Sequence, residues 1–535
     1  MCGAGAGAIA YICAHADTAP RMLTRRDFVA AALAAPALSA GAQTAGFPLG
    51  VAAGDPRPDG FVIWTRLARD VLHPDGAGGL PAAPIPTGWQ VAEDEGFTRI
   101  AVHGEALARP EDAHTLHVAI SGLRPGRPYW YRFAAAGAHS DVGRARTAPA
   151  PDTLPDALSW AVAGCQRYDH GLYAIWRDIA RQELDFVFHY GDYIYEYALT
   201  PGGGREMPQA PLFLPLPTAS PAEMLAAYRN RHALTRLDPD LRAAHAAHAF
   251  VVSFDDHEVQ NNWSADTRWM GSVERRTAAL KAWWEHMPLP EAMRPEPDGA
   301  VTAHRRLRFG ALADLLVLDT RQHRARQACA VSWSGEPPCE EMLHDAAHPR
   351  ALLGGAQEAW LAHALAAPTG RWSVLAEQVL MMPWRMPGGG VDTDKWDGYP
   401  TQRGRVLDML AARPERARNA LVLSGDIHSA YAGEIWRDAA GPGAGRLAVE
   451  FTGTSVTSGR NGHAGPAARK AQPGGDLNPH IAFSDNRRGW LRMELHHDRA
   501  EAHFRAAPRV DVPDIRLTEI ARFAVEAGRM ALVSG

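Results

Sequence analysis

Four short apolar runs along the chain each stop at a residue with a reactive or metal-binding side chain. The runs are "SWAVAG" before Cys165, "DFVFHYG" before Asp192, "AFVVSF" before Asp255 and "NALVLSG" before Asp426. Short runs of apolar, β-favouring residues that end at glycine or aspartate predict buried strands. In open α/β sheets, ligand-binding groups gather at the carboxyl ends of the strands. We therefore expect the four strand ends to lie at one edge of an α/β domain.

The side chains at these four strand ends share one kind of chemistry. A single aspartate after a strand is usually a turn residue or a helix N-cap, so one strand end alone would indicate little. Together, the four hold a thiol, a phenol, an imidazole and several carboxylates, and the carboxylates would repel one another without a cation. Thiolate and phenolate suit ferric iron, whereas carboxylate and amide oxygens suit a hard divalent ion. The pattern predicts a mixed metal cluster.

The regions around these strands differ in their pattern. From residue 45 to 150, short runs separated by glycine and proline predict a small N-terminal β-sandwich domain. A proline-rich linker at 147–157 marks the boundary to a second domain over 155–510, in which strand-like and helix-like segments alternate. Helical spacing of apolar residues predicts helices at 171–182 and 273–287.

The last segment, residues 511–535, contains another helical pattern, over 514–530. Four apolar residues fall on one face of this predicted helix: Ile520, Phe523, Ala524 and Ala527. Such a helix either packs on the second domain as plain structure or lies across the strand ends as a lid. The sequence leaves both uses open.

Length and charge narrow the class of protein. A chain of 535 residues is too long for one core, so two or more domains are expected. With 46% hydrophobic and 21% charged residues, the composition is that of a soluble globular protein, and we expect a monomer. The net charge of -5 gives no reason to expect binding to nucleic acid or to an anionic membrane. No internal run is long and apolar enough to be a membrane anchor.

The N-terminal residues 1–42 form a predicted leader. The stretch "TRRDFVAAALAAPALSAGA" places Arg25 and Arg26 before an Ala/Leu-rich run and a small-residue cleavage pattern, as in twin-arginine signal peptides. The alternative is a membrane anchor, but an apolar run of about 14 residues is short for one. We therefore expect the twin-arginine export machinery to deliver a periplasmic or secreted protein. Met22 is the expected start, because the preceding residues have no signal-like pattern.

The five cysteines separate by position. Cys2 and Cys13 fall in the predicted leader. Cys329 and Cys339 flank the segment "AVSWSGEPP", and an exported protein meets an oxidising compartment, so we expect a local disulfide. Cys165 is left over. A lone buried cysteine is usually a small apolar residue, and only its neighbours at the strand ends argue for a ligand.

The motifs along the chain resemble those of the PhoD-like alkaline phosphatases, a branch of the calcineurin-like metallophosphoesterases. The resemblance covers about Phe47 to Leu495 and is carried by "GVAAGDPRPDGFVIWTRL", "AGCQ", "HYGDYIYE", "DDHEVQNNW", "LDTRQHR", "WDGYPTQR", "LSGDIHSA" and "EFTGTSVTSG". It implies a four-layer αββα metallophosphoesterase sandwich preceded by the small N-terminal β-domain. It also implies Fe3+ and Ca2+ as cofactors.

The resemblance also implies which residues are metal ligands. Cys165, Tyr195 and His428 would hold iron, and Asp192 would bridge the metals. Asp256, Asn262 and Asp426 would bind calcium. Whether Asn261 or Asn262 is the ligand, and what Asp255 does, stays open.

These residues predict an exported phosphatase or phosphodiesterase that attacks phosphate esters with a metal-bound hydroxide. No serine or threonine is placed as a covalent nucleophile. His257 is the candidate that steadies or protonates the leaving oxygen, although it could instead support Asp256 structurally. Arg321 could clamp a phosphate, or it could pair with a nearby aspartate. The loop containing Trp396, Asp397 and Tyr399 could line the rim of the site, or it could be a plain turn around Gly398.

Two other functions stay open at this stage. A phospholipase D-like phosphodiesterase would use the same metals with a different pocket. A non-catalytic, exported, metal-stabilised binding protein would use them for structure alone. Structural metal sites are closed by protein ligands, whereas catalytic sites keep a position for water. A bound phosphate or a metal-bridging solvent molecule would therefore separate the enzymes from the binding protein.

Overall fold

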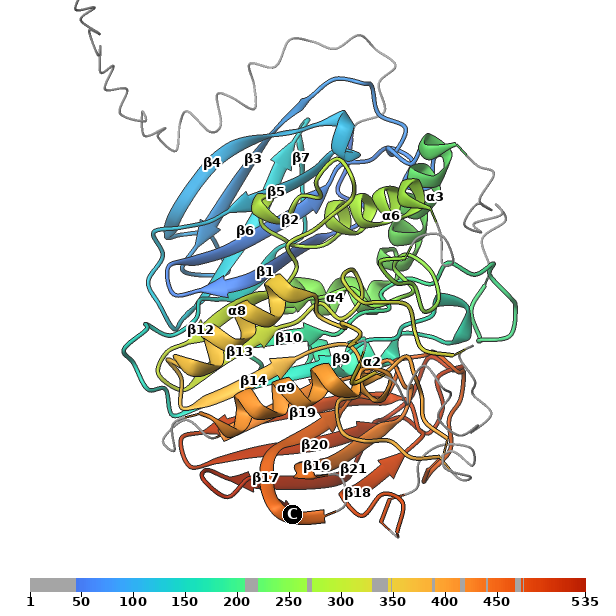
Figure 1. The fold of residues 1–535 in the computed structure, drawn as a ribbon. Coiled ribbons are helices and arrows are strands. Elements are labelled where there is room, and N and C mark those ends of the chain that lie inside the picture. The colour runs from blue at the N-terminus through green and yellow to red at the C-terminus, as the bar shows by residue number, and fades with distance from the viewer. Residues whose placement is uncertain are drawn as a thin grey trace, which may run out of the picture. The chain divides into compact units, whose positions relative to one another are not determined.

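The computed structural model (Figure 1) describes most of the chain after the predicted leader. The leader, with its paired arginines and with Cys2 and Cys13, lies outside the described residues. The described residues are 45–535 without 207–219, 267–271, 330–344, 348, 387–389, 414–418, 439–440, 467–472 and 475. In this part of the chain, no helix is both long and apolar enough to cross a membrane.

Two large sheets contain the four strands predicted before the reactive side chains. The ten-stranded sheet has the order β22 (Leu532–Ser534), β21 (Thr518–Glu526), β20 (Arg499–Ala506), β19 (Gly489–His496), β9 (Ala157–Ala163), β10 (Phe186–His189), β11 (Ala249–Val252), β1 (Val51–Arg57), β2 (Gly60–Arg66) and β5 (Thr115–Ala119). The seven-stranded sheet has the order β12 (Arg305–Phe309), β13 (Ala313–Val317), β14 (Trp372–Ala376), β15 (Asn419–Ser424), β17 (Gly441–Thr452), β16 (Ala430–Asp438) and β18 (Ile481–Asp485). Strands β9, β10, β11 and β1 are parallel, as are β13, β14, β15 and β17.

The helices fall into two sets. The α-helices are α2 (Ala174–Ala180), α3 (Pro221–Arg236), α4 (Pro239–Ala247), α6 (Val273–His286), α8 (Gly355–Ala366) and α9 (Pro400–Ala411). Short 3-10 helices cover Pro110–Asp112, Tyr168–His170, Glu291–Met293 and Trp396–Gly398. Helices α2 and α6 lie within the segments predicted as helical at 171–182 and 273–287.

Successive residues of the central strands face opposite sides of their sheet, and the contacts on the two sides show that the fold has four layers. In β9, Trp160 and Val162 contact the core between the two large sheets, and the alternate residues pack with α2, α4 and α6. In β15, Leu421 and Leu423 contact the same inner core, and the alternate residues pack with α8 and α9. Figure 1 shows α8 and α9 running over the strands of the seven-stranded sheet. The predicted αββα sandwich is confirmed.

The N-terminal strands form a sandwich that shares one layer with the main fold. A smaller sheet has the order β4 (Ile100–Ala108), β3 (Ile85–Ala92), β6 (Pro128–Ala135) and β7 (Ala138–His139), and β8 (Gly143–Arg146) pairs with β6. Its Tyr131 and Phe133 pack on Phe61 and Ile63 of β2, which belongs to the ten-stranded sheet. The first strand, β1, pairs in parallel with β11. The N-terminal segment therefore extends the main sheet as well as covering it.

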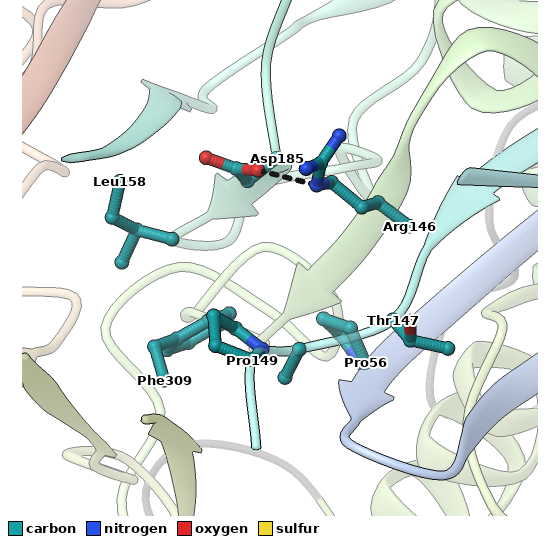
Figure 2. Close-up of a pocket in the computed structure, with 8 residues that line it drawn as sticks. Pro56, Arg146, Thr147, Pro149, Leu158, Asp185 and Phe309 are labelled. Atoms are coloured by element: carbon teal, nitrogen blue, oxygen red, sulfur yellow. Dashed lines mark ion pairs between the residues drawn. The ribbon is translucent and has the colours of Figure 1, made fainter. Parts of the chain in front are cut away.

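The predicted linker at 147–157 is packed into this junction. Figure 2 shows Pro149 beside Phe309 at the end of β12, with Leu158 of β9 nearby. Above them, the Arg146 guanidinium faces the Asp185 carboxylate, with Nε and Oδ1 separated by 3.2 Å. These residues line a cavity of about 10 Å³, which is room for roughly one water molecule. A cavity of this volume is too small to hold an organic ligand.

The prediction of a C-terminal helix over 514–530 is wrong. Within this segment, Thr518–Glu526 forms β21, which pairs antiparallel with β20 and is followed by β22. Phe523 and Val525 are buried, whereas Arg522, Ala524 and Glu526 beside them are less buried, and both side chains pack into the core between the two large sheets. The sequence carries both a helical and an alternating pattern here, and pairing with β20 decides between them. A helical lid is therefore excluded.

Candidate metal centre

The four predicted strand ends meet, although they come from two sheets. Cys165, Asp192 and Asp255 follow β9, β10 and β11 of the ten-stranded sheet, and Asp426 follows β15 of the other. Three groups of side chains here have potential ligand atoms within 4.8 Å of one another: Cys165 with Asp192 and His428, Asp192 with Asp256 and His257, and Asp255 with Asp256 and Asp426. Asp192 and Asp256 each belong to two groups, so the three form one continuous cluster.

Most of the predicted ligands have a strained backbone. Residues other than glycine rarely adopt positive φ, and such strain is concentrated at functional sites. Five of the seven predicted ligands adopt it: Cys165 at 52°, Asp192 at 57°, Asn262 at 53°, Asp426 at 63° and His428 at 55°. The turns that follow the strands therefore hold these side chains in conformations that would not arise without the surrounding fold.

The ring of Tyr190 fixes how closely the two sheets approach each other at this site. It packs on three glycines, Gly164, Gly425 and Gly453, and a Cβ on any of them would lie 2.8 Å or less from the ring. The Tyr190 hydroxyl donates a 2.5 Å hydrogen bond to the Thr454 carbonyl. This packing explains why the motifs "AGCQ", "LSGDIHSA" and "EFTGTSVTSG" each contain a glycine where the chain leaves its strand.

The thiol and phenol side of the cluster is tightly packed. The Tyr195 hydroxyl donates to Asp192 Oδ2 at 2.5 Å and lies 3.2 Å from His428 Nε2. Ser458, in the "EFTGTSVTSG" motif, donates to the Tyr195 oxygen at 2.6 Å. Burial raises the pKa of Cys165 well above its usual range, and the charge of Asp192 raises it further. A thiol in this environment loses its proton only if a cation binds the sulfur. The thiol, phenol and imidazole together therefore fit a Lewis-acidic metal ion.

The carboxylate side has oxygen atoms that accept no hydrogen bond. Among the described residues, Asp255 Oδ2 and Asp256 Oδ1 have no donor, although both atoms are buried. The other Asp256 oxygen accepts from the Asn262 backbone N–H at 2.7 Å. Asn262 is buried, whereas Asn261 is exposed and donates its N–H to Glu196. Buried, unsatisfied carboxylate oxygens are the groups that a hard divalent cation would complete.

Arg321 is surrounded by carboxylates. Its Nε donates to Asp255, its Nη1 lies 2.9 Å from Asp394 Oδ2, and its Nη2 lies 3.1 Å from Asp426 Oδ1. Asp394 also accepts from Arg324 at 2.5 Å. Every guanidinium nitrogen thus has a carboxylate partner, which matches the predicted alternative of a structural ion pair. Arg321 holds the aspartates in place rather than pointing at open space.

His257 is held by a residue that sequence reasoning missed. Its Nδ1 lies 2.7 Å from Glu196 Oε2, and its Nε2 faces Asp256 Oδ2 at 3.9 Å. Burial alone would lower the pKa of His257, but the charges of Asp256, Asp192 and Glu196 outweigh it and raise the pKa to about 10. Glu196 ends the motif "HYGDYIYE", and its place beside Tyr195 was the available signal.

The loop at 391–399 differs from the prediction in two ways. Trp396, Asp397 and Tyr399 are buried and hydrogen-bonded to Glu377, Trp384 and Ala325, so the interpretation as an exposed rim is wrong. The neighbouring Lys395 was missed, and its buried ammonium contacts the Asp426 carboxylate. The sequence contained one indication of its importance, because lysine is rare in this chain. The three lysines are Lys281, Lys395 and Lys470.

The cluster is open on one side. The His428 side chain is 30% exposed, whereas Cys165 in the same group is fully buried. Closed coordination is typical of structural sites, and an accessible ligand is typical of catalytic ones. The geometry therefore favours an enzyme over a metal-stabilised binding protein.

A four-layer αββα sandwich with thiol, phenol, imidazole and carboxylate groups at its strand ends belongs to the class of metal-dependent phosphoesterases. The sequence profile of PhoD-like phosphatase matches residues 160–504, and that of the PhoD-like phosphatase N-terminal domain matches residues 32–149. The chain belongs to the PhoD-like phosphatase family.

Two relatives agree with this assignment. The chain is 39% identical over 497 residues to alkaline phosphatase D of Bacillus subtilis. The alignment covers 91% of this chain and 82% of that protein. A solved structure of PhoD superposes with a TM-score of 0.83 at 37% identity and covers 93% of both chains. The resemblance seen in the motifs is confirmed, and the protein is a phosphatase of the alkaline phosphatase D type.

Proposed function

We propose that this phosphatase is an exported enzyme that hydrolyses phosphate esters with ferric iron and calcium. Cys165, Tyr195 and His428 hold the iron in this proposal, and Asp192 is shared between the metals. Calcium is bound by a further set: Asp256, Asn262 and Asp426. The observation that supports the proposal is the continuous cluster, in which Asp192 belongs both to the group with a thiol and to a group with Asp256, and Asp256 in turn belongs to a group of three carboxylates.

When bound, the metals supply Lewis acidity to the phosphoryl oxygens and a nucleophilic water of lowered pKa. The chain's own residues do the rest. Glu196 orients the His257 ring so that Nε2 faces the cluster, where it can give a proton to the leaving oxygen. Arg321 keeps Asp255 and Asp426 apart at fixed positions, which preserves the shape of the site while the substrate exchanges.

The proposal that the protein is exported depends on the predicted leader at residues 1–42. The paired arginines Arg25 and Arg26 support delivery by the twin-arginine machinery, which carries folded proteins and so suits an enzyme that acquires its metals first. Cys329 is disulfide-bonded, which suits an oxidising compartment, and its predicted partner Cys339 lies outside the described residues. N-terminal sequencing of the mature protein tests this proposal and should find a start near residue 43.

Metal content and colour test the cofactor assignment. Cys165→Ala should lose the visible absorption of ferric iron with thiolate and phenolate ligands, together with most activity, while Cys165→Ser should keep some iron. Dialysis against a calcium-preferring chelator should abolish hydrolysis and leave the colour. A coloured, active Cys165→Ala variant, or full activity without calcium, would exclude this assignment.

The balance of monoester and diester substrates needs a direct comparison. Turnover of a chromogenic phosphomonoester should be measured beside its bis-ester, with iron and calcium supplied. Higher turnover of the bis-ester would favour a phosphodiesterase, including the phospholipase D-like alternative. No turnover of either ester by fully metallated protein would favour the non-catalytic binding protein.

A further inference from the structure

A second polar cluster lies around Arg236 at the end of α3 and contains none of the predicted metal ligands. The Arg236 side chain is 1% exposed, and its Nη2 donates to the His286 carbonyl at 2.9 Å. Its Nε and Nη1 have no hydrogen-bond acceptor, and it makes no ion pair with any described carboxylate. The Arg236 guanidinium carbon lies 4.7 Å from the ring centre of Trp64 and 5.6 Å from that of Tyr193. Aromatic faces offset a buried guanidinium charge only in part.

Other buried polar side chains gather around the same tyrosine ring. The ring centre of Tyr193 lies 5.2 Å from that of His189, 5.9 Å from that of His245 and 6.0 Å from that of His232. All three histidines are fully buried. Together with Arg236, they surround Tyr193 with four side chains that carry N–H groups.

Several of these groups have no hydrogen-bond partner among the residues that the structure describes. The Gly191 N–H donates to His189 Nδ1, so the neutral ring carries its proton on Nε2, which has no acceptor. Both ring nitrogens of His232 are unpaired, as are the hydroxyls of Tyr131 and Thr235. The Tyr193 phenol is the group that interacts most strongly with the Arg236 guanidinium, also as a hydrogen-bond partner, and the Tyr131 phenol interacts with it less strongly. Buried polar atoms rarely go unpaired in native proteins, so this concentration requires an explanation.

We infer that the Arg236 cluster binds a small monovalent anion of the halide class. Arg236 Nε and Nη1 and the His189 Nε2–H can only donate, and His232 and the two hydroxyls can each donate as well. These groups need an acceptor, and the buried guanidinium needs one negative charge to balance it. A metal cation is disfavoured by Arg236 itself. A water molecule would accept hydrogen bonds but would leave the positive charge uncompensated. A halide ion satisfies both requirements.

The position of the cluster suggests what the anion would do. Tyr193 follows Asp192 directly, and its backbone N–H donates to Glu258 at 2.5 Å. Fixing the groups around the Tyr193 ring would stabilise the turn that leaves β10. The anion would therefore support the fold next to the metal centre without taking part in hydrolysis.

Thermal unfolding at constant ionic strength tests the inference. Replacing sodium gluconate stepwise by sodium bromide should raise the Tm of the wild type by roughly 2 °C or more, with saturation. Arg236→Met should lose this dependence. Arg229→Met is the matched control, because Arg229 lies on the same helix but is paired with Glu285 at 2.6 Å. That variant should be less stable yet keep the bromide response. An equal response in Arg236→Met would overturn the inference.

Crystals of the wild type grown in bromide give a test that needs no variant. An anomalous peak within hydrogen-bond distance of the Arg236 guanidinium would support the site, even if Arg236→Met fails to fold. Electron density for water alone at that position, without an anomalous signal at saturating bromide, would refute it.

Discussion

His257 has its orientation set by one hydrogen bond to Glu196 and its reactive nitrogen turned to the cluster. His257→Asn should lower kcat by about 10²- to 10⁴-fold for an alkyl phosphate, because the leaving oxygen then lacks its proton donor. The loss should be much smaller for a nitrophenyl ester, whose leaving group needs no proton. Steady-state kinetics with both esters and metal analysis of the variant provide the measurement. Equal losses for both esters would indicate a purely structural role.

Glu450 gives a pH-dependent prediction away from the ligands. Burial raises its pKa to about 7, from an ordinary value of 4.5, even though Ser424 and two backbone N–H groups donate to it. The folded chain therefore keeps a proton that the unfolded chain releases. The stabilising contribution of Glu450 is full below pH 4.5 and is lost as the pH rises through 7. Glu450→Gln removes this titration.

The free energy of unfolding measures the effect of Glu450→Gln. Relative to the wild type, the variant should gain about 3 kcal/mol between pH 4.5 and pH 8. At pH 4.5 the variant should be the less stable of the two proteins, because the glutamine NH2 group cannot accept the hydrogen bonds that one Glu450 oxygen accepts. A constant difference between the two proteins across this pH range would refute the prediction.

At the scale of the elements, the glycines around Tyr190 are the most sensitive packing positions. Gly425→Ala would place a Cβ 2.3 Å from the Tyr190 ring, which is also confined by two other glycines. We expect a loss of about 1–3 kcal/mol in unfolding free energy and a lower metal content. Gly404→Ala on α9 is the control, since a Cβ there meets nothing within 4 Å and should be neutral or stabilising. An unchanged Gly425→Ala variant would show that the ring can move.

The C-terminal strand β21 should behave as core structure. Phe523→Ala should cost about 3–5 kcal/mol, because the side chain packs between the two large sheets. Val533→Ala on the neighbouring β22 should have little effect, since Val533 is exposed. Denaturant unfolding of both variants gives the comparison. Activity on monoesters and diesters should fall together in Phe523→Ala, and a selective gain on diesters would contradict this account.

Strands were predicted correctly where the pattern of apolar residues fits a buried strand alone. The prediction failed where the same residues fit both a helical and a strand pattern. The run before Asp192 has no helical period, so its apolar residues could only form a buried strand. Residues 514–530 satisfy both periods, and the deciding factor is the pairing of Phe523 with Ala502 on β20, which is a tertiary contact. Trp396 illustrates a second limit, because the sequence contains no sign that Glu377 would accept its N–H.

The candidate site was predictable in its ligand types but not in its supporting contacts. Cys165 and Asp192 follow recognisable strands, so their neighbourhood could be inferred from topology. Glu196 and Lys395 join the site through loop conformations, and neither the position of Glu196 beside Tyr195 nor the rarity of lysine indicates which side chain each of them contacts. Arg321 was recognised, but its carboxylate partners come from segments far apart in the chain.

For the whole molecule, the metals should couple the two large sheets, since the cluster takes Asp192 from one and Asp426 from the other. Removing iron and calcium together should lower the Tm in a single cooperative transition, and restoring both should reverse the change. Differential scanning calorimetry measures this, with the metals added back separately as controls. A Tm unaffected by metal removal would show that metal binding does not contribute to the stability of the fold.

The position of β9 also has a consequence for synthesis. Val162 of this central strand pairs with Leu491 of β19, near the other end of the chain. At about 5–20 residues per second, a ribosome needs roughly 15–65 s to reach β19 after making β9. One edge of β9 therefore has no partner during that interval, and unpaired strand edges invite association with other chains. Slow translation between these strands should increase aggregation of the nascent protein without altering the stability of the finished one.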